Sequence, residues 1–380
     1  MNAQNKKAIV IGCSISGLAA ASLLSRKLKV AVIEQKSRDT ISGKVCANVV
    51  TSKFLNLAEK LGINAQKTIL RKFTLAKFYS ENSSVELPVE DYEISRKKLL
   101  ELLLEKAKAN GVEFRFETRL LGLEKIQKGY AIFSEKKGRK KIETADYIIA
   151  ADGALSSAAK KAGLWQGREF WLAMHANSAK INRKIPAGSY EIFFRKKFGY
   201  YSYIFPSGGN GFIAGIVASP KDARRNFSRL LKFLGIRKYR VESALIPKPR
   251  ALNTHKRNLF LLGDAACQVK FTGGGIIPAI ESAFALHDML LLKNRKKNNS
   301  LKWEIFLHQL VSRVLSKLDE RDMHTLFGIA GKTGKKSAKS RDELRSSAVG
   351  VVLRNPRLLK FLQKLLLCQK CLRKPPSLEC

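Results

Sequence analysis

The sequence lacks the long apolar runs, clustered cysteines and paired histidines that mark several classes of protein. No stretch of about 18 apolar residues occurs, which argues against a membrane-spanning helix. The polar residues 1–7 lead directly into an apolar, strand-like run, so we expect no signal peptide. Six cysteines scattered over 380 residues do not make a disulfide framework, and five dispersed histidines predict no metal site. From these absences we expect a cytoplasmic protein whose cysteines are reduced.

Acidic residues are also scarce, because Asp and Glu total 31 against 71 Lys and Arg, for a formal net charge of +40. Nucleic acid, an anionic membrane surface, an anionic substrate and a basic bias of the whole proteome would each account for this excess. The sequence has no aromatic–basic RNA signature, no zinc-finger spacing and no basic helix of the type that reads DNA. We therefore expect no nucleic-acid partner.

The N-terminal segment carries the clearest pattern. Residues 8–11 are an apolar run suited to a strand buried on both faces, and a helix-forming run follows at 18–24. A second apolar run at 30–33 ends in Glu34. Strand, glycine turn, helix, strand and acid in this order predict a dinucleotide-binding unit. In such a unit the helix N-terminus binds a pyrophosphate and the acid binds a ribose hydroxyl.

The turn in this unit has Gly12 and Gly17, but Ser14 stands where a third glycine is usual. That glycine normally lets the backbone approach the phosphates closely. With a serine there, the side chain either turns away from the ligand or donates its hydroxyl proton to the pyrophosphate. A plain βαβ unit with a chance pair of glycines is a further alternative, which the acid at Glu34 disfavours.

Helix and strand signals alternate through the next part of the chain. We expect helices at 53–62 and 97–110, the second opened by Arg96, and a hairpin at 73–89. Residues 112–150 predict a meander of short strands with a basic hairpin tip. The expected strands of the meander are 114–116, 130–133 and 147–150, the tip is 136–141, and a tight turn follows at Asp152–Gly153.

Residues 165–250 change in character and become aromatic and alternating. Strands are expected at 190–194, 200–206 and 212–217, which predicts the antiparallel sheet of a second domain.

A second glycine-rich turn follows this segment. The apolar run 259–262 leads into Gly263 and Asp264, and three further glycines precede the apolar helix expected at 277–292. A strand, an acid and glycines that open a helix predict another site for an anion or polar cofactor at a helix N-terminus.

The C-terminal region, 293–380, is basic and predicted to be helical. Leucines in 353–372 lie on one helical face with basic residues around them. This pattern suits a helix lying on anionic lipid and equally suits an amphipathic helix docked on the protein. We interpret Cys368 and Cys371 as an incidental pair, because no second pair or βαβ context accompanies them.

The order of these motifs resembles the geranylgeranyl reductase family of flavoproteins, within the p-hydroxybenzoate-hydroxylase-like superfamily. The resemblance covers roughly residues 7–292 and implies FAD as the cofactor. The FAD-binding residues that it implies are Gly12, Ser14, Ile15, Gly17, Glu34, Cys46, Ala47, Arg96, Leu120, Asp264, Gly274, Gly275 and Ile276.

Two further segments resemble the reductases rather than the hydroxylases. Lys44-Val45-Cys46 is similar to a K-x-C signature near the isoalloxazine ring, and this implies a catalytic role for Cys46; the alternative is a buried small hydrophobe. A second segment is similar to the Y-x-W-x-F-P motif of the lipid cavity, although a tyrosine replaces the tryptophan. The substrate-binding residues that it implies are Tyr201, Tyr203, Phe205 and Pro206, and core packing is the alternative role for the three rings.

The expected fold is therefore α/β, with a discontinuous Rossmann-like FAD-binding domain, an inserted antiparallel β-sheet substrate domain and a helical C-terminal tail. The expected parts of the FAD-binding domain are 1–72, 93–164 and 251–292. The hairpin 73–92 joins the substrate domain, 165–250, and the tail is 293–380.

The resemblance implies a FAD-dependent reductase that saturates C=C bonds of geranylgeranyl chains in archaeal-type isoprenoid glycerophospholipids, a step of membrane lipid biosynthesis. The electron donor would be NAD(P)H or a ferredoxin. A basic protein would suit peripheral association with the anionic inner face of the cell membrane. The alternatives are a monooxygenase or halogenase on the same scaffold, and a non-catalytic basic binding protein with a flavin fold.

Overall fold

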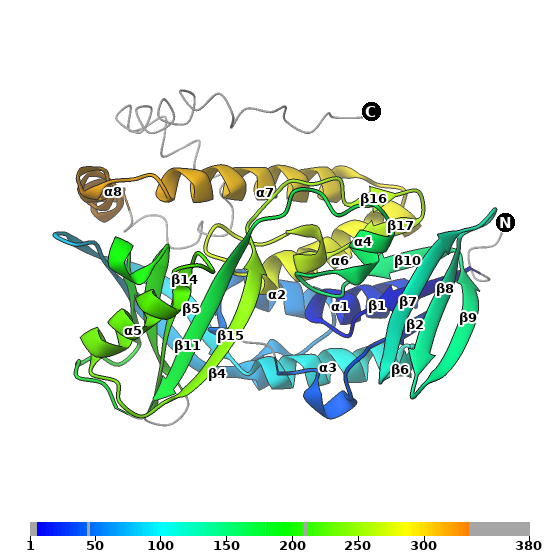
Figure 1. Cartoon of the computed structure of the whole chain (residues 1–380), viewed down its shortest axis with the longest axis horizontal. Coiled ribbons are helices and arrows are strands. Elements are labelled where there is room, and N and C mark those ends of the chain that lie inside the picture. Colours follow the sequence, from blue (N-terminus) through cyan, green and yellow to red (C-terminus); the bar gives the residue numbers. More distant parts are fainter. Residues whose placement is uncertain (1–5, 44–45, 179, 208–210, 334–380) are drawn as a thin grey trace.

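The structure is a computed structural model that describes residues 6–43, 46–178, 180–207 and 211–333. It contains a mainly parallel sheet with helices against it, a large mixed sheet and a small antiparallel sheet (Figure 1).

The first sheet is built from the apolar runs that were expected to be buried strands. Its order is β16-β17-β10-β1-β2-β6, and all neighbours run parallel except the β16–β17 pair. Its central strands are almost fully buried, which suits their continuous valine and isoleucine runs. The strands are β1 (Lys7–Ile11), β2 (Lys29–Ile33), β6 (Glu113–Arg115), β10 (Tyr147–Ala150), β16 (His255–Lys256) and β17 (Leu259–Leu261).

The second sheet has eight strands in the order β15-β11-β14-β13-β12-β4-β5-β3. Neighbours are antiparallel apart from β12 and β4, which run parallel. The predicted hairpin is present as β4 and β5. The strands are β3 (Val49–Thr51), β4 (Ile69–Tyr79), β5 (Ser84–Ile94), β11 (Phe170–Ser178), β12 (Ser189–Phe193), β13 (Tyr201–Ser207), β14 (Gly211–Ala218) and β15 (Arg240–Pro247).

The two faces of the eight-stranded sheet are covered differently. One face packs against helix α5 (Ala223–Leu234), and the other carries an aromatic cluster that packs against Ala47 and Val49. Helix α5 was not predicted, although Phe227, Leu230 and Leu234 have helical spacing. The segments on both sides of this helix alternate as strands do, so its helical spacing of apolar residues was not recognised.

The third sheet corrects the predicted meander of residues 112–150. Only its middle part is a meander, formed by β7 (Thr118–Lys125), β8 (Tyr130–Lys136) and β9 (Arg139–Ala145). The strands expected at 114–116 and 147–150 instead pair with β2 and β1 in the parallel sheet. Their short apolar runs do not reveal their partners, which are distant in sequence. The basic tip is confirmed, because the β8–β9 turn falls within 136–141.

The helices lie mainly against the parallel sheet and around it. Helix α1 is buried along its whole length, and it packs against α3 and α6 (Figure 1). Helix α7 packs on α6, and α8 contacts β5. The helices are α1 (Ile15–Leu24), α2 (Lys53–Lys60), α3 (Arg96–Ala109), α4 (Ser157–Lys161), α6 (Ile276–Leu291), α7 (Lys296–Leu315) and α8 (Glu320–Thr333).

The fold class predicted from the sequence is confirmed: a Rossmann-like α/β unit, a mostly antiparallel sheet and C-terminal helices. The domain boundaries stay a prediction. So do the helix at 353–372 and the interpretation of Cys368 and Cys371, which lie outside the described residues. Among the helices of the described ranges, none has both the length and the apolar content needed to cross a bilayer.

Two glycines allow α1 to begin directly against the parallel sheet. Gly12 has a φ of +101°, and a Cβ there would lie 2.5 Å from the Ala151 carbonyl oxygen. A Cβ at Gly17 would overlap the Gly12 carbonyl oxygen and lie 3.2 Å from Ala151 Cβ. Because backbone atoms cannot give way as a flexible side chain can, any larger residue at Gly17 must push α1 away from β1 and β10.

We expect Gly17→Ala to destabilise the fold by about 1–3 kcal/mol, since it overpacks a closed contact. The matched control is Gly328→Ala in α8, where nothing lies within 4 Å of the added Cβ. That change should stabilise by about 0.5–1 kcal/mol, because alanine favours a helix. Urea unfolding measures both, and equal stability of the two variants would contradict the packing argument.

Candidate functional site

The glycine turn after β1 is tied to the end of β2. The Gly12 N–H donates to the Ile33 carbonyl oxygen at 2.8 Å, and the Cys13 N–H donates to Glu34 Oε2 at 2.7 Å. The Thr118 N–H donates to the Glu34 carbonyl oxygen at 2.8 Å, which brings the start of β7 and its buried Leu120 to the same edge. Gly12, Glu34 and Leu120 therefore lie at one edge of the parallel sheet.

Ser14 uses its hydroxyl inside the protein. Its side chain is the N-cap of α1 and accepts from the Gly17 N–H at 3.2 Å. The hydroxyl donates to the Ala151 carbonyl oxygen at 3.0 Å and also lies 3.0 Å from Ser16 Oγ. The side chain thus faces Ala151 at the end of β10. Because it caps the Gly17 N–H, the first-turn N–H groups left for a ligand at the start of α1 are those of Ile15 and Ser16.

The second glycine turn lies beside the first one. The short 3₁₀ helix η5 (Gly263–Ala266) follows β17, and a Cβ at Gly263 would lie 2.8 Å from Ser16 Oγ. A Cβ at Gly275, the N-cap of α6, would lie 3.0 Å from Asp264 Oδ1. The N-termini of α1 and α6 and the Asp264 carboxylate therefore meet at one edge of the parallel sheet.

Arg96 lies between this edge and Cys46. Its side chain is buried, and Nη1 donates to the Ser42 carbonyl oxygen at 2.9 Å. Burial lowers the pKa of Arg96, while the nearby Cys46 and Asp264 act in the opposite direction. A guanidinium this far from water is stabilised by an anion, and a phosphate is such an anion.

The three cysteines in the described ranges differ in their surroundings. Burial raises the pKa of Cys13 to about 12 and that of Cys267 to about 11, so both remain thiols. Cys46 is only partly buried, and its Sγ accepts from the Asn48 N–H at 3.3 Å. Cys46 is therefore the thiol that faces open space.

The predicted substrate residues lie on β13. The rings of Tyr201, Tyr203 and Phe205 follow one another on one face, with centroids 6.0 and 5.2 Å apart. Tyr201 donates to the Thr272 carbonyl oxygen at 2.6 Å, which ties this sheet to the second glycine turn. By strand alternation, Pro206 faces the α5 side instead. Burial raises the pKa of both tyrosines, so they stay protonated.

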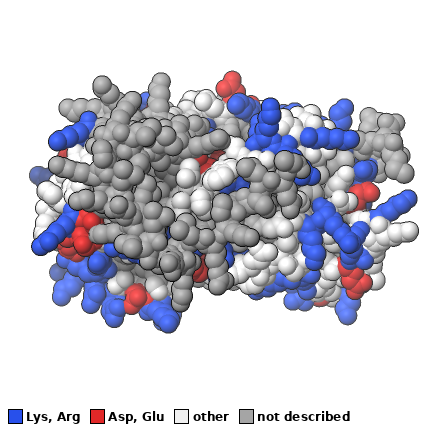
Figure 2. Space-filling model, turned by 90° about the horizontal axis from the view of Figure 1, so that it is seen from above, with Lys and Arg blue, Asp and Glu red and all other residues white. Residues whose placement is uncertain are grey.

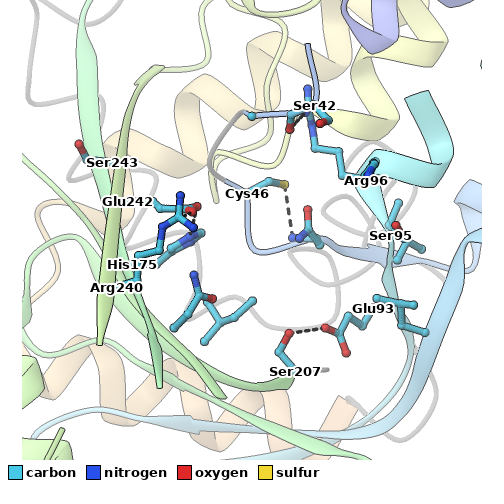
Figure 3. Close-up of a pocket in the computed structure, with 17 residues that line it drawn as sticks. Ser42, Cys46, Glu93, Ser95, Arg96, His175, Ser207, Arg240, Glu242 and Ser243 are labelled. Atoms are coloured by element: carbon cyan, nitrogen blue, oxygen red, sulfur yellow. Dashed lines mark hydrogen bonds and ion pairs between the residues drawn. The ribbon is translucent and has the colours of Figure 1, made fainter. Parts of the chain in front are cut away.

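A cavity of about 640 Å³ opens beside Cys46 and Arg96 (Figure 3). The rings of β13 do not line it, because they pack in the aromatic cluster. Several polar residues that do line it were missed by the sequence analysis, since an isolated polar residue in a strand gives no local signal. They are Asn48, Glu93, His175, Ser207 and Glu242.

Comparison with known proteins places this arrangement in a family. Residues 5–225 match the family model described as FAD binding domain. The chain is 22% identical to the digeranylgeranylglycerophospholipid reductase of Methanococcus vannielii, over 94% of this chain and 97% of the relative.

Solved structures share the fold. A geranylgeranyl bacteriochlorophyll reductase-like protein from Thermoplasma acidophilum superposes with a TM-score of 0.75 at 18% identity, covering 94% of this chain and 99% of that chain. The p-nitrophenol 4-monooxygenase of Pseudomonas putida gives a TM-score of 0.71 at 14% identity, covering 98% and 100%. The fold is thus common to reductases and monooxygenases.

The residues at the sheet edge fit FAD. Two helix N-termini and the buried Arg96 favour a pyrophosphate, and Gly12 and Gly17 let α1 begin directly against the sheet edge where it would bind. The alternative of a non-catalytic binding protein is set aside by the match to reductases along nearly the whole chain. The chain belongs to the FAD binding domain family and is a FAD-dependent oxidoreductase.

Proposed function

We propose that the protein is a reductase that saturates C=C bonds in the geranylgeranyl chains of archaeal-type glycerophospholipids. The observation that carries the proposal is the similarity to a digeranylgeranylglycerophospholipid reductase over 94% of the chain, combined with Cys46 at the cavity beside Arg96. A phospholipid substrate would also account for the net charge of +40, because the membrane that contains the lipid is anionic and attracts a basic protein.

Under this proposal, the first glycine turn holds the adenosine half of FAD and the second turn holds the flavin half. Glu34 binds the ribose, and the N–H groups at the start of α1 bind the pyrophosphate with Arg96 nearby. Asp264 binds the ribityl chain. Ala47, Gly274 and Ile276 contact the flavin ring.

The chemistry needs a proton as well as a hydride, because an isolated alkene has no carbonyl to stabilise a carbanion. When bound and reduced by NAD(P)H or a ferredoxin, FAD would supply the hydride. The Cys46 thiol, oriented by the Asn48 N–H, delivers the proton to the other carbon. The rings of Tyr201, Tyr203 and Phe205 pack in the aromatic cluster near Cys46 and not in the cavity wall. In this proposal they stabilise cationic character at the tertiary carbon and do not line the space for the prenyl chain.

A basic patch on the surface supports peripheral membrane association. It contains seven exposed cations and the exposed apolar side chains Phe233, Tyr239 and Val241, which are 41%, 46% and 48% exposed. Figure 2 shows basic side chains gathered at the left end of the molecule, the end at which Figure 1 places α5. The cations of the patch are Arg224, Arg225, Arg229, Lys232, Arg237, Lys238 and Arg240.

A monooxygenase is the second candidate, because the fold superposes on p-nitrophenol 4-monooxygenase with a TM-score of 0.71. A monooxygenase consumes O₂, whereas a reductase consumes only electrons. A halogenase would likewise need O₂.

Anaerobic incubation with dithionite and a digeranylgeranyl glycerophospholipid separates these candidates. We expect the lipid mass to rise in steps of about two daltons, one for each double bond reduced, as the addition of two hydrogens requires. Protein without FAD is the control. An unchanged lipid mass with flavin bound would contradict the proposal, and oxygen-dependent hydroxylation would favour the monooxygenase.

Replacing Cys46 tests the proton donor. We expect Cys46→Ala to keep its FAD while kcat falls by about 10²–10⁴, the usual contribution of a general acid. Cys46→Ser retains a weaker donor and should fall between the alanine variant and the wild type. Flavin absorbance and single-turnover rates measure the two effects separately. A wild-type rate in Cys46→Ala with full FAD removes the thiol from the mechanism.

Co-sedimentation with phosphatidylglycerol vesicles tests the membrane proposal. Each basic residue near such a surface contributes about 1 kcal/mol, so changing Arg224, Arg229 and Lys232 to Gln should weaken binding by on the order of 100-fold. The matched control neutralises three cations of the hairpin tip 136–141 and should bind like the wild type. Binding should fall at high salt. No binding of the wild type at low salt defeats the proposal.

A further inference from the structure

The cavity beside Cys46 is separate from most of the proposed FAD site. It lies between the start of α3 and the strands β11 and β15, with Cys46 and Arg96 at one side (Figure 3). Neither the glycine turn at residues 12–17 nor the turn at residues 273–276 lines it. The cavity therefore offers space for a second ligand next to the flavin.

The interior of the cavity has polar side chains with unused hydrogen-bonding atoms. Glu93 and His175 are each 3% exposed. Glu93 Oε1 accepts from Ser207 Oγ at 2.6 Å, and His175 Nε2 lies 3.1 Å from Glu242 Oε2. The other atoms of these groups, Glu93 Oε2 and His175 Nδ1, have no hydrogen-bond partner among the described residues, and neither has Asn48 Oδ1.

All three unused atoms are acceptors. Burial lowers the pKa of His175, so its ring is neutral near pH 7. Nε2 then carries the proton that faces the Glu242 carboxylate, and Nδ1 presents a lone pair. Glu93 Oε2 is 3.8 Å from Arg71 Nε, which gives it a charged neighbour but no hydrogen bond. Buried acceptors of this kind are stabilised by a ligand that brings several donors, and hydroxyl groups are such donors.

The rim of the cavity has the opposite character. Lys97 and Arg240 line it and are exposed, and Arg240 also belongs to the basic patch. Arg240 Nε lies 3.7 Å from Glu242 Oε1, so this cation is partly paired, and Lys97 supplies a second charge from the opposite side, at the start of α3. A ligand that suits both regions has hydroxyl groups for the interior and an anionic group for the rim. An unsubstituted prenyl chain satisfies neither region, because it has no donor and no charge.

We propose that this cavity binds the polyhydroxylated, phosphate-bearing head group of the lipid, with the prenyl chain passing Cys46 toward the flavin. The identity of the ligand as a lipid head group rests on the proposed function. The acceptors inside bind the hydroxyls, and Lys97 with Arg240 binds the phosphate. The same chemistry is present in free glycerol phosphate, which serves as the probe.

Titration calorimetry of the FAD-loaded protein with glycerol phosphate tests the assignment, with glycerol and inorganic phosphate as separate titrations. The wild type should bind glycerol phosphate more tightly than either fragment. Glu93→Gln keeps the size of the side chain but replaces one carboxylate oxygen by an amide NH2 group. The binding of glycerol phosphate should weaken about tenfold or more, as expected for a lost hydrogen bond to a charged group. Glu86→Gln is the control, since Glu86 lies on the same strand, paired with Lys77 outside the cavity.

A second variant does not depend on the buried carboxylate. Lys97→Gln changes an exposed position. It should weaken the binding of glycerol phosphate and of inorganic phosphate but leave the binding of glycerol unchanged. Lys98→Gln is its neighbour on the helix, pairs with Glu101 and does not line the cavity, so it should bind like the wild type. The assignment is overturned if the wild type does not bind glycerol phosphate, or if inorganic phosphate binds equally tightly.

Two measurements keep this proposal apart from the proposed reaction. Loss of FAD from Glu93→Gln would assign the cavity to the flavin and overturn the head-group site. Binding of glycerol phosphate as described, without any reduction of prenyl lipid, would reject the reaction and keep the site. For an active enzyme, Glu93→Gln should raise KM for the phospholipid about tenfold and leave KM for geranylgeraniol unchanged.

Discussion

The close approach of helix α1 to the carboxyl edge of the parallel sheet positions most of the candidate site. A side chain at Gly12 would meet the Ala151 carbonyl oxygen at 2.5 Å, so the turn leaves no gap between strand and helix. Because α1 begins there, the Ser14 hydroxyl reaches Ala151 and Ser16 reaches Gly263. Two glycine turns about 250 residues apart in sequence therefore form one site, and an elongated dinucleotide needs two such ends.

The eight-stranded sheet is oriented by its contacts with this edge. The hydrogen bond from Tyr201 to the Thr272 carbonyl oxygen ties β13 to the turn that opens α6. The same face packs against Ala47, which follows Cys46 in the chain. A Cβ at Gly215 would overlap the Tyr203 ring, so the ring lies flat across β14 rather than upright. The aromatic cluster and the Cys46 thiol therefore lie close together, although they come from two separate parts of the chain.

The sequence predicted the parts of the site that depend on local pattern. Gly12, Glu34 and Asp264 follow apolar runs, and parallel strands bring their carboxyl ends together, so their convergence could be foreseen. The cavity could not be foreseen, because His175 and Glu242 meet only through the pairing of β11 with β15. Strands 114–116 and 147–150 were assigned to the wrong sheet for the same reason: their partners are distant in sequence.

The excess of basic charge becomes interpretable once the chain is folded. The cations of α5 and the start of β15 are adjacent in sequence and carry three exposed apolar side chains among them, a combination suited to a lipid surface. Arg240 belongs both to this patch and to the rim of the cavity. Under the proposed function, a head group entering there would come from the membrane to which the patch would bind. Attraction to the bilayer and recognition of one lipid would then share the same residues, because both act on phosphate. A cavity with acceptors inside and cations at its rim would select the proposed lipid by its hydroxyl groups, which the general surface attraction does not distinguish.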